Sequence, residues 1–175
     1  MQTQALYSIQ VLKAVYYSIV YSHLRYAITS WGSSSFSTLN TLNIIHIKLL
    51  RIMTVSKFNS NVYKLYKDTQ ILTIDRIFKL LISKLMYKIK FRLVPEQFTE
   101  LFTNIEDIHS YHTRQRSSIE YPIPRTRLKI AQKSFTYTGI GIWSSIDLTI
   151  RSIPNYHLFV TKLKHKHQEE QSYHI

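Results

Sequence analysis

The feature that most restricts the fold of this chain is a run of apolar residues at helical spacing, in a sequence with very little glycine or proline. Only 3 Gly and 4 Pro occur among 175 residues, so long stretches lack the residues that interrupt helices. After Thr73, whose side chain can cap a helix, apolar residues recur at intervals of three and four. They are Ile74, Ile77, Phe78, Leu81, Ile82, Leu85, Met86 and Ile89. This spacing predicts a helix with one buried face, and Pro95 marks its end.

Earlier segments also show helical spacing. A helix is predicted from Leu39 to Met53, and a shorter one from Val62 to Lys67. The predicted inner face of the first of these carries Leu42, Ile45, Leu49, Ile52 and Met53. Residues from Leu6 to His23 are apolar almost all round and rich in tyrosine, as expected of a helix covered on several sides. We expect some of the residues that pack against this helix to lie outside this chain. Tyr16, Ile19 and Val20 would then be partly exposed.

The second half of the chain has a different character. Charged and turn-forming residues replace the helical stripe, which predicts an extended basic arm. Residues from Lys133 to Ser145 favour β-structure around two glycines and predict a short strand or hairpin leading to Trp143. After Pro154 an amphipathic helix is predicted, with Leu158, Phe159 and Leu163 facing inward. The predicted fold is mainly α: a helical region at 1–103, the arm with short strands at 104–154, and a C-terminal helix and tail at 155–175.

The charge of the chain indicates its class of partner. With 23 Lys and Arg against 10 Asp and Glu, the formal net charge is +13, which favours nucleic acid first and an anionic membrane surface second. Cysteine is absent, which excludes disulfides and thiolate metal sites. The N-terminus shows no signal-peptide pattern, and the longest charge-free stretch is too rich in Ser, Thr and Asn to span a bilayer. We therefore expect an intracellular protein, cytoplasmic or nuclear.

A cluster of basic residues in the arm is the candidate nucleic-acid-binding site. Arg114, Arg116, Arg125, Arg127, Lys129 and Lys133 lie within twenty positions that contain one acid, Glu120. Guanidinium groups bind phosphate oxygens bidentately, and the interleaved aromatic residues Tyr111, Tyr121, Phe135 and Tyr137 could stack on unpaired bases. Such a patch provides affinity without reading sequence. The alternative is a solvated basic loop that binds nothing specific.

Neither a metal site nor a catalytic site is predicted. The close histidine pairs, His109 with His112 and His165 with His167, lack the further ligands that zinc needs. His46 lies on an apolar stripe, where a hydrogen-bonded core histidine is expected. The carboxylates are scattered, whereas two-metal phosphoryl transfer needs several of them at one point. We expect no cofactor, no small-molecule substrate and no enzymatic activity from this chain.

Four separated blocks resemble one protein family. The stretch from Tyr16 to Gly32, YYSIVYSHLRYAITSWG, is similar to the region just beyond the palm of non-LTR (LINE-type, jockey-like) retrotransposon reverse transcriptases. LLRIMTV, at 49–55, resembles the helix that follows there. HSYHTR, at 109–114, is similar to the family's His-x-Tyr-x-Thr-Arg motif, and GIGIWSSI, at 139–146, to its Gly-x-x-x-Trp block. The motif residues are Trp31, Gly32, His109, Tyr111, Thr113, Arg114, Gly139 and Trp143. Ala27, Ser144 and Asp147 depart from the family pattern.

The resemblance implies a thumb-like helical bundle and C-terminal region that help to hold template and duplex. The fingers and palm would precede Met1 and would be its partners. The palm motif, an aromatic residue followed by x-Asp-Asp, is absent, so the resemblance does not carry RNA-directed DNA polymerisation over to this chain. Two other functions remain open: a repurposed free-standing nucleic-acid-binding protein, and a peripheral protein of a membrane surface.

The first prediction concerns catalysis. Purified protein should show no primer extension on an RNA template with magnesium or manganese, because no pair of carboxylates is placed to hold the metal ions. The measurement is extension of a labelled primer, with an active reverse transcriptase as positive control. Reproducible, template-dependent extension by a clean preparation would contradict the prediction.

Overall fold

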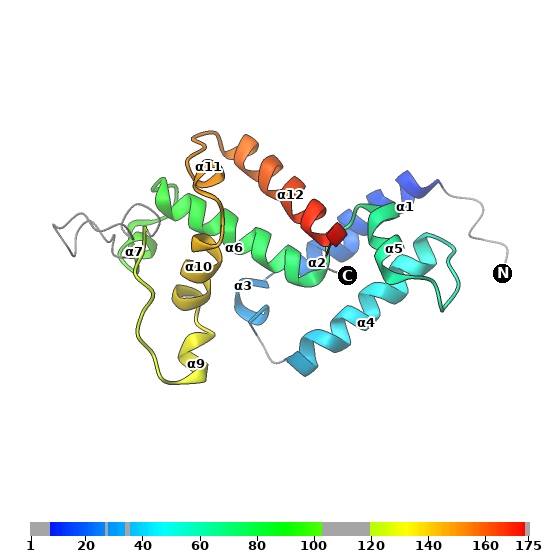
Figure 1. Ribbon diagram of the computed structural model, residues 1–175, viewed down its shortest axis with the longest axis horizontal. Helices are drawn as coiled ribbons and strands as arrows, with labels where there is room; N and C mark the ends of the chain where they lie inside the picture. The colour runs from blue at the N-terminus through cyan, green and yellow to red at the C-terminus, as the bar shows by residue number, and fades with distance from the viewer. Residues whose placement is uncertain (1–7, 27, 34–35, 103–119, 174–175) are drawn as a thin grey trace. The chain divides into compact units, whose positions relative to one another are not determined.

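The computed structural model of the chain describes residues 8–26, 28–33, 36–102 and 120–173. Within these ranges the regular elements are helices and no strand occurs, which confirms a mainly α fold (Figure 1). The chain divides into two compact units: Met1–Phe78 with His165–Ile175, here called unit 1, and Lys79–Lys164, called unit 2. The boundaries predicted at 103 and 154 follow a different division and stay a prediction.

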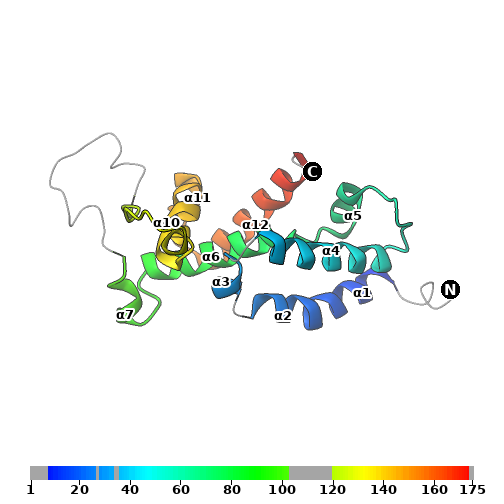
Figure 2. The same cartoon turned by 90° about the horizontal axis from the view of Figure 1, so that it is seen from below.

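Unit 1 is built from short and long helices. They are α1 (Ile9–Val15), the π-helix η2 (Tyr16–Val20), α2 (Tyr21–Arg25), α3 (Ile28–Trp31), α4 (Phe36–Met53), α5 (Val62–Thr69), the start of α6 (Ile74–Lys90) and the end of α12 (Tyr156–Tyr173). The predicted helices at 39–53 and 62–67 are therefore present with slightly wider bounds. Helices α1 and α4 contact each other, and Figure 2 shows them side by side.

The core of unit 1 joins α1–η2 to α4 and α5. Its buried members are Tyr16, Leu50, Met53, Leu65, Tyr66 and Ile71. Tyr16 is only 2% exposed, so the expectation that it lacks cover within this chain is wrong. Ile19 is 56% exposed as predicted, and Val20 is half-buried. One side of the α1–η2 segment is thus packed in the core, and another side is exposed to solvent.

A buried histidine links two tyrosines in this core. Nε2 of His46 lies 2.9 Å from the Tyr16 hydroxyl, and Nδ1 lies 3.2 Å from the Tyr66 hydroxyl. A neutral imidazole has one N–H donor and one acceptor nitrogen, so one hydroxyl accepts a hydrogen bond while the other donates one. Burial lowers the pKa of His46 to about 4 and raises that of Tyr66 to about 12, so all three groups are neutral at pH 7. The predicted hydrogen-bonded core histidine is confirmed.

These hydrogen bonds correct the predicted orientation of α4. Ile45 and Ile52, predicted to face inward, are each 58% exposed. The buried face carries Met53, as predicted, together with His46 and Leu50, and Leu42 and Leu49 are half-buried. Two tyrosine hydroxyls satisfy the ring nitrogens of His46 in the core, and the helix orientation that allows this leaves Ile45 and Ile52 exposed.

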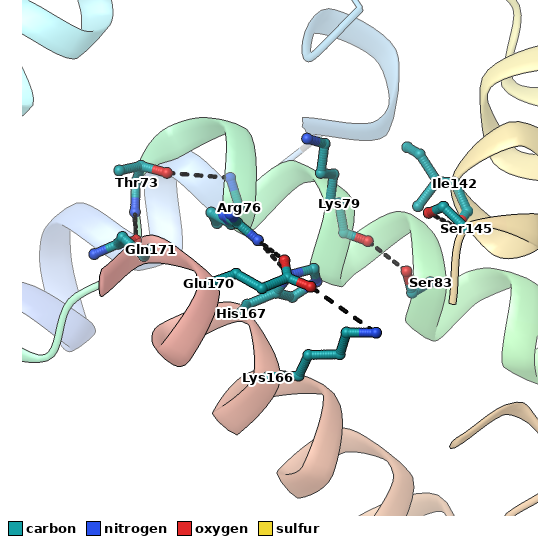
Figure 3. A network of polar contacts seen from close by, with 10 residues as sticks. All are labelled: Thr73, Arg76, Lys79, Ser83, Ile142, Ser145, Lys166, His167, Glu170 and Gln171. Carbon is teal, nitrogen blue, oxygen red and sulfur yellow. Dashed lines mark hydrogen bonds and ion pairs between the residues drawn. The ribbon is translucent and has the colours of Figure 1, made fainter. Parts of the chain in front are cut away.

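The end of α12 is held in unit 1 by polar contacts. Gln171 is buried; its amide oxygen accepts from the Thr73 backbone N–H at 3.0 Å, and its amide nitrogen donates to the Ile71 carbonyl at 3.1 Å. Arg76 forms an ion pair with Glu170, and its Nη1 lies 3.3 Å from His167 Nδ1 (Figure 3). Burial raises the pKa of Glu170, but the hydrogen bond and charge of Arg76 outweigh that effect and lower it. Backbone groups between α5 and α6 thus find their partners about a hundred residues away.

Unit 2 contains the rest of α6, α7 (Glu96–Thr99), α9 (Lys129–Gln132), α10 (Phe135–Ser144), α11 (Leu148–Arg151) and the start of α12. An aromatic cluster forms much of its core. The rings of Tyr87 and Phe159 stack with centroids 4.5 Å apart, and the Tyr87 hydroxyl donates to the Pro154 carbonyl at 2.5 Å. The Trp143 ring lies 6.0 Å from that of Phe159, and both side chains are fully buried.

The predicted β-hairpin at Lys133–Ser145 is wrong, because residues Phe135–Ser144 form helix α10. The Ser134 hydroxyl accepts from the Tyr137 backbone N–H at 3.4 Å and caps this helix. Buried Gly139, Ile140 and Trp143 fall at helical spacing, so one face packs into the core. Packing of this face overrides the β-propensity of the segment.

The apolar stripes of the two long helices are largely confirmed. Thr73 Oγ1 accepts from the Arg76 backbone N–H at 3.4 Å, and every predicted stripe residue of α6 is buried except half-buried Leu85. Helix α6 ends at Lys90, before Pro95. Just beyond the helix, Arg92 adopts a left-handed conformation with φ of 52°. In α12, Phe159 and Leu163 are buried as predicted, but Leu158 is 47% exposed.

The histidine in the core of unit 1 generates a pH prediction. The pKa of His46 is about 4 in the fold against an ordinary value of 6.5, so the unfolded chain binds more protons between these values. Stability is therefore fully present above pH 6.5 and falls as the pH drops toward 4, by roughly 3 kcal/mol from this group. Urea unfolding followed by far-UV circular dichroism measures it.

His46→Gln should be less stable at pH 7 and should lose much of this pH dependence. His23→Gln, at an exposed position in α2, is the matched control and should titrate like the unmodified chain. Parallel stability curves for the unmodified chain and His46→Gln would contradict the prediction.

Candidate nucleic-acid interface

The described part of the predicted interface lies in unit 2. Arg125 and Arg127 are in the segment before α9, Lys129 begins α9, and Lys133 follows its last residue. The predicted contacts Tyr111, Arg114 and Arg116, and the motif residues His109 and Thr113, lie outside the described residues.

Residues 122–128 form no helix, whereas α9, α10 and α11 occupy much of the later part of the predicted arm at 104–154. Pro122 and Pro124 fix their own φ angles, lack N–H donors and push the preceding residues toward extended conformations. Arg125 and Arg127 are exposed, whereas Thr126 between them is half-buried. The Gln132 side-chain amide donates to the Thr126 carbonyl at 3.2 Å and ties the segment to α9. Both guanidinium groups are thus presented from an anchored backbone.

The four cations are open to solvent. Arg125, Arg127, Lys129 and Lys133 are all exposed, and none of them forms an ion pair within the described ranges. Like charges this close repel each other, and a polyanion relieves that repulsion.

Glu120, the one acid of the cluster, forms hydrogen bonds to residues of unit 2 other than the arginines. Its carboxylate accepts from Lys90 Nζ at 2.6 Å and from Trp143 Nε1 at 2.8 Å. Lys90 also donates to the Arg151 carbonyl at 3.1 Å. The acid therefore anchors the start of the arm and does not neutralise the exposed arginines. Sequence reasoning missed this role, although a lone acid in a basic run was a signal for it.

Two aromatic residues proposed for base stacking serve the core instead. Tyr121 is buried at 5% exposure, and its ring meets that of Phe102 edge-on at 5.7 Å. Burial, followed by the charge of Glu120, raises the pKa of Tyr121 to about 12. Phe135 is half-buried and also contacts Phe102, at 5.5 Å. Tyr137 is half-buried in α10.

Exposed aliphatic residues accompany the cations. Leu128 is 68% exposed, Ile130 79% and Ile123 48%. Sequence spacing gave no signal for these three exposed residues. They give the arm a mixed basic and apolar surface.

The described family-motif residues occupy packing positions. A Cβ atom on Gly32 would lie 2.6 Å from the Ile28 carbonyl oxygen and against the Phe78 ring, so no larger residue fits in unit 1. Trp31, beside it, donates from Nε1 to the Tyr26 carbonyl at 3.0 Å. In unit 2, a Cβ atom on Gly139 would lie 3.1 Å from Met86 Sδ. These residues support close helix packing rather than chemistry.

The chain matches no protein-family model, no curated protein and no solved structure. The resemblance to non-LTR reverse transcriptases thus rests on the sequence blocks alone. In the described parts of the chain, no helix is both long and apolar enough to cross a bilayer. The same residues contain no group of three His, Cys, Asp or Glu side chains that could hold a metal ion.

The Glu120 contacts generate a stability prediction. Glu120→Ala should lower the free energy of unfolding by roughly 2 kcal/mol, because the fully buried Trp143 N–H loses its acceptor and Lys90 loses its counter-charge. Glu120→Gln keeps an acceptor and should cost less. Exposed Glu100→Ala is the control. Equal losses in Glu120→Ala and Glu100→Ala, measured by urea unfolding, would refute this role.

Proposed function

We propose that the chain is a non-catalytic, nucleic-acid-binding C-terminal fragment of the non-LTR reverse-transcriptase type, and that its arm binds RNA or DNA without reading sequence. The observation that carries the proposal is the set of four exposed cations whose neighbouring acid is already engaged. The order of the four family-like blocks supports the assignment to this type. Polymerisation is not part of the proposal, because the sequence lacks the aspartate pair of the palm.

The chemistry of the arm suits the phosphate backbone. Arginine guanidinium groups bind phosphate oxygens in pairs, and lysine ammonium groups act as point charges beside them. Binding would release condensed counterions, so affinity should fall steeply with salt. With Tyr121 in the core, the described part of the arm offers few groups for base edges. Phosphate contacts alone fix position and supply no sequence specificity.

An anionic membrane surface is the second candidate partner. The exposed side chains of Leu128 and Ile130 favour it, because aliphatic groups beside cations can enter the headgroup region of a bilayer. Phosphate binding does not require them. Substitution of these two residues therefore separates the two functions.

The fourth prediction tests the arm. Replacing Arg125, Arg127, Lys129 and Lys133 together by Ala should weaken binding to single-stranded RNA and to duplex DNA and flatten the salt dependence. The slope of log K against log salt should fall by up to about 3 units, close to one per lost phosphate contact. Fluorescence anisotropy over a salt series measures both quantities.

The matched control removes the same charge from unit 1, with Arg25, Lys57, Lys64 and Lys67 replaced by Ala; all four are exposed. Its salt slope should change less. Equal slopes for the two variants would show that only net charge matters and that the arm is no interface.

Leu128→Ser with Ile130→Ser should leave RNA affinity nearly unchanged under the proposal. Vesicles containing anionic lipid test the second candidate partner, the membrane surface. Strong vesicle binding that this double variant abolishes, together with RNA binding that is insensitive to the four cations, would favour the membrane surface.

A further inference from the structure

Phe58 is a large aromatic side chain that the fold of unit 1 leaves in solvent. It is 76% exposed, whereas Phe78, Phe102 and Phe159 are buried. The guanidinium carbon of Arg51 lies 5.1 Å from the centre of the Phe58 ring, in a cation–π contact that covers one face of the ring. The high exposure of the residue shows that most of the remaining ring surface is open.

A hydrogen-bonded loop between α4 and α5 carries this phenylalanine (Figure 1). The Ser56 backbone N–H donates to the Arg51 carbonyl at 3.0 Å, and the Ser60 N–H donates to the Lys57 carbonyl at 3.0 Å. Val55 adopts a left-handed conformation with φ of 53°, which is strained for a β-branched residue. The phenylalanine is the second residue of the turn that Lys57 begins. A ring presented from such a preformed turn loses little further freedom when a ligand covers it.

The charges beside the ring restrict what can cover it. Lys57 is exposed and Arg51 is half-buried, and neither forms an ion pair within the described ranges. The first acidic residue of the whole chain is Asp68, so no carboxylate precedes it in the sequence. The covering group should therefore present a flat face to the ring and negative charge to the two cations.

A nucleotide without a base-pairing partner meets both requirements. Its base offers an aromatic face, and its phosphate offers charge to a guanidinium or an ammonium group. The other residues of the turn, Lys57, Asn59 and Ser60, are polar, so burying the tip in hydrocarbon would cost the hydration of their side chains. In a duplex each base is already stacked on its neighbours, which leaves the ring only an unpaired base.

We propose that Phe58 stacks on an unpaired nucleobase while Arg51 and Lys57 bind adjacent phosphates, which gives unit 1 a single-strand site in addition to the arm of unit 2. The inference rests on the proposed nucleic-acid binding and adds to it a contact with bases. Stacking tolerates every base, so the site selects single strands over duplexes without reading sequence. Lys57 adds at most one phosphate contact, so the unit 1 control of the arm experiment keeps its smaller expected change in salt slope.

The test compares two labelled strands of equal length: oligodeoxythymidine, and an abasic strand with the same number of phosphates. Fluorescence anisotropy with the full chain measures both affinities. The unmodified chain should bind the thymidine strand at least about fivefold more tightly, because only this strand has bases that can stack.

Three variants locate the stacking. Phe58→Ala should lose the preference for the thymidine strand and keep its affinity for the abasic strand. Phe58→Tyr retains an aromatic ring and should retain the preference. Phe98→Ala, at an exposed phenylalanine of α7, is the matched control and should also retain it.

Photo-crosslinking identifies the contact directly. A 5-iodouracil base placed in the thymidine strand crosslinks under ultraviolet light to an aromatic side chain on which it stacks. Mass spectrometry of the digested complex should find the crosslink at Phe58. Crosslinks at other residues alone would contradict the assignment.

The outcomes separate this site from the arm. Equal affinities of the unmodified chain for the two strands, or a preference that Phe58→Ala leaves intact, would overturn the single-strand site and leave the arm proposal standing. Failure to bind either strand would overturn both proposals. The four-cation variant of the arm should weaken binding of both strands alike and keep the preference. Binding to vesicles of anionic lipid that Phe58→Ala abolishes, without any preference between the strands, would assign the ring to a membrane surface.

Discussion

The burial of α6 is the constraint on which the rest of the structure depends. Its first turn contributes Ile74, Ile77 and Phe78 to unit 1, and its later turns contribute Met86, Tyr87 and Ile89 to unit 2. Each of these side chains, when fully buried, provides roughly 1.5 to 3 kcal/mol, whereas a whole domain is stable by only about 5 to 15 kcal/mol. One helix therefore supplies a large share of the apolar burial in both units, and the short helices of each unit depend on this share.

Much of the fold could be predicted from the sequence, because long apolar stripes at helical spacing are strong signals. The α6 stripe and the buried Phe159 and Leu163 of α12 are examples. Prediction failed where tertiary packing decided the outcome. The rotation of α4 depends on hydrogen bonds from His46 to tyrosines twenty and thirty residues away, and α10 became a helix because its buried residues share one helical face.

The candidate site was predictable in charge but not in geometry. The clustering of basic residues in the sequence identified Arg125, Arg127, Lys129 and Lys133, and all four are exposed in the structure. Sequence alone could not show that Glu120 turns toward Trp143 and Lys90, because these residues come together only through folding. In the described structure, Trp143, Gly32 and Gly139 occupy close-packed positions.

The discontinuity of unit 1 in sequence has a consequence for synthesis. Met1–Phe78 is translated before unit 2, whereas His165–Ile175, which belongs to the same unit, is translated after it. Until Gln171 emerges, the Ile71 carbonyl and the Thr73 amide lack the side-chain partner that they have in the finished fold. Closing so long a loop costs little more entropy than closing a short one, but such distant contacts form slowly. Unit 1 can therefore be completed only after the whole of unit 2 has been synthesised, and its side-chain contacts to Ile71 and Thr73 form late.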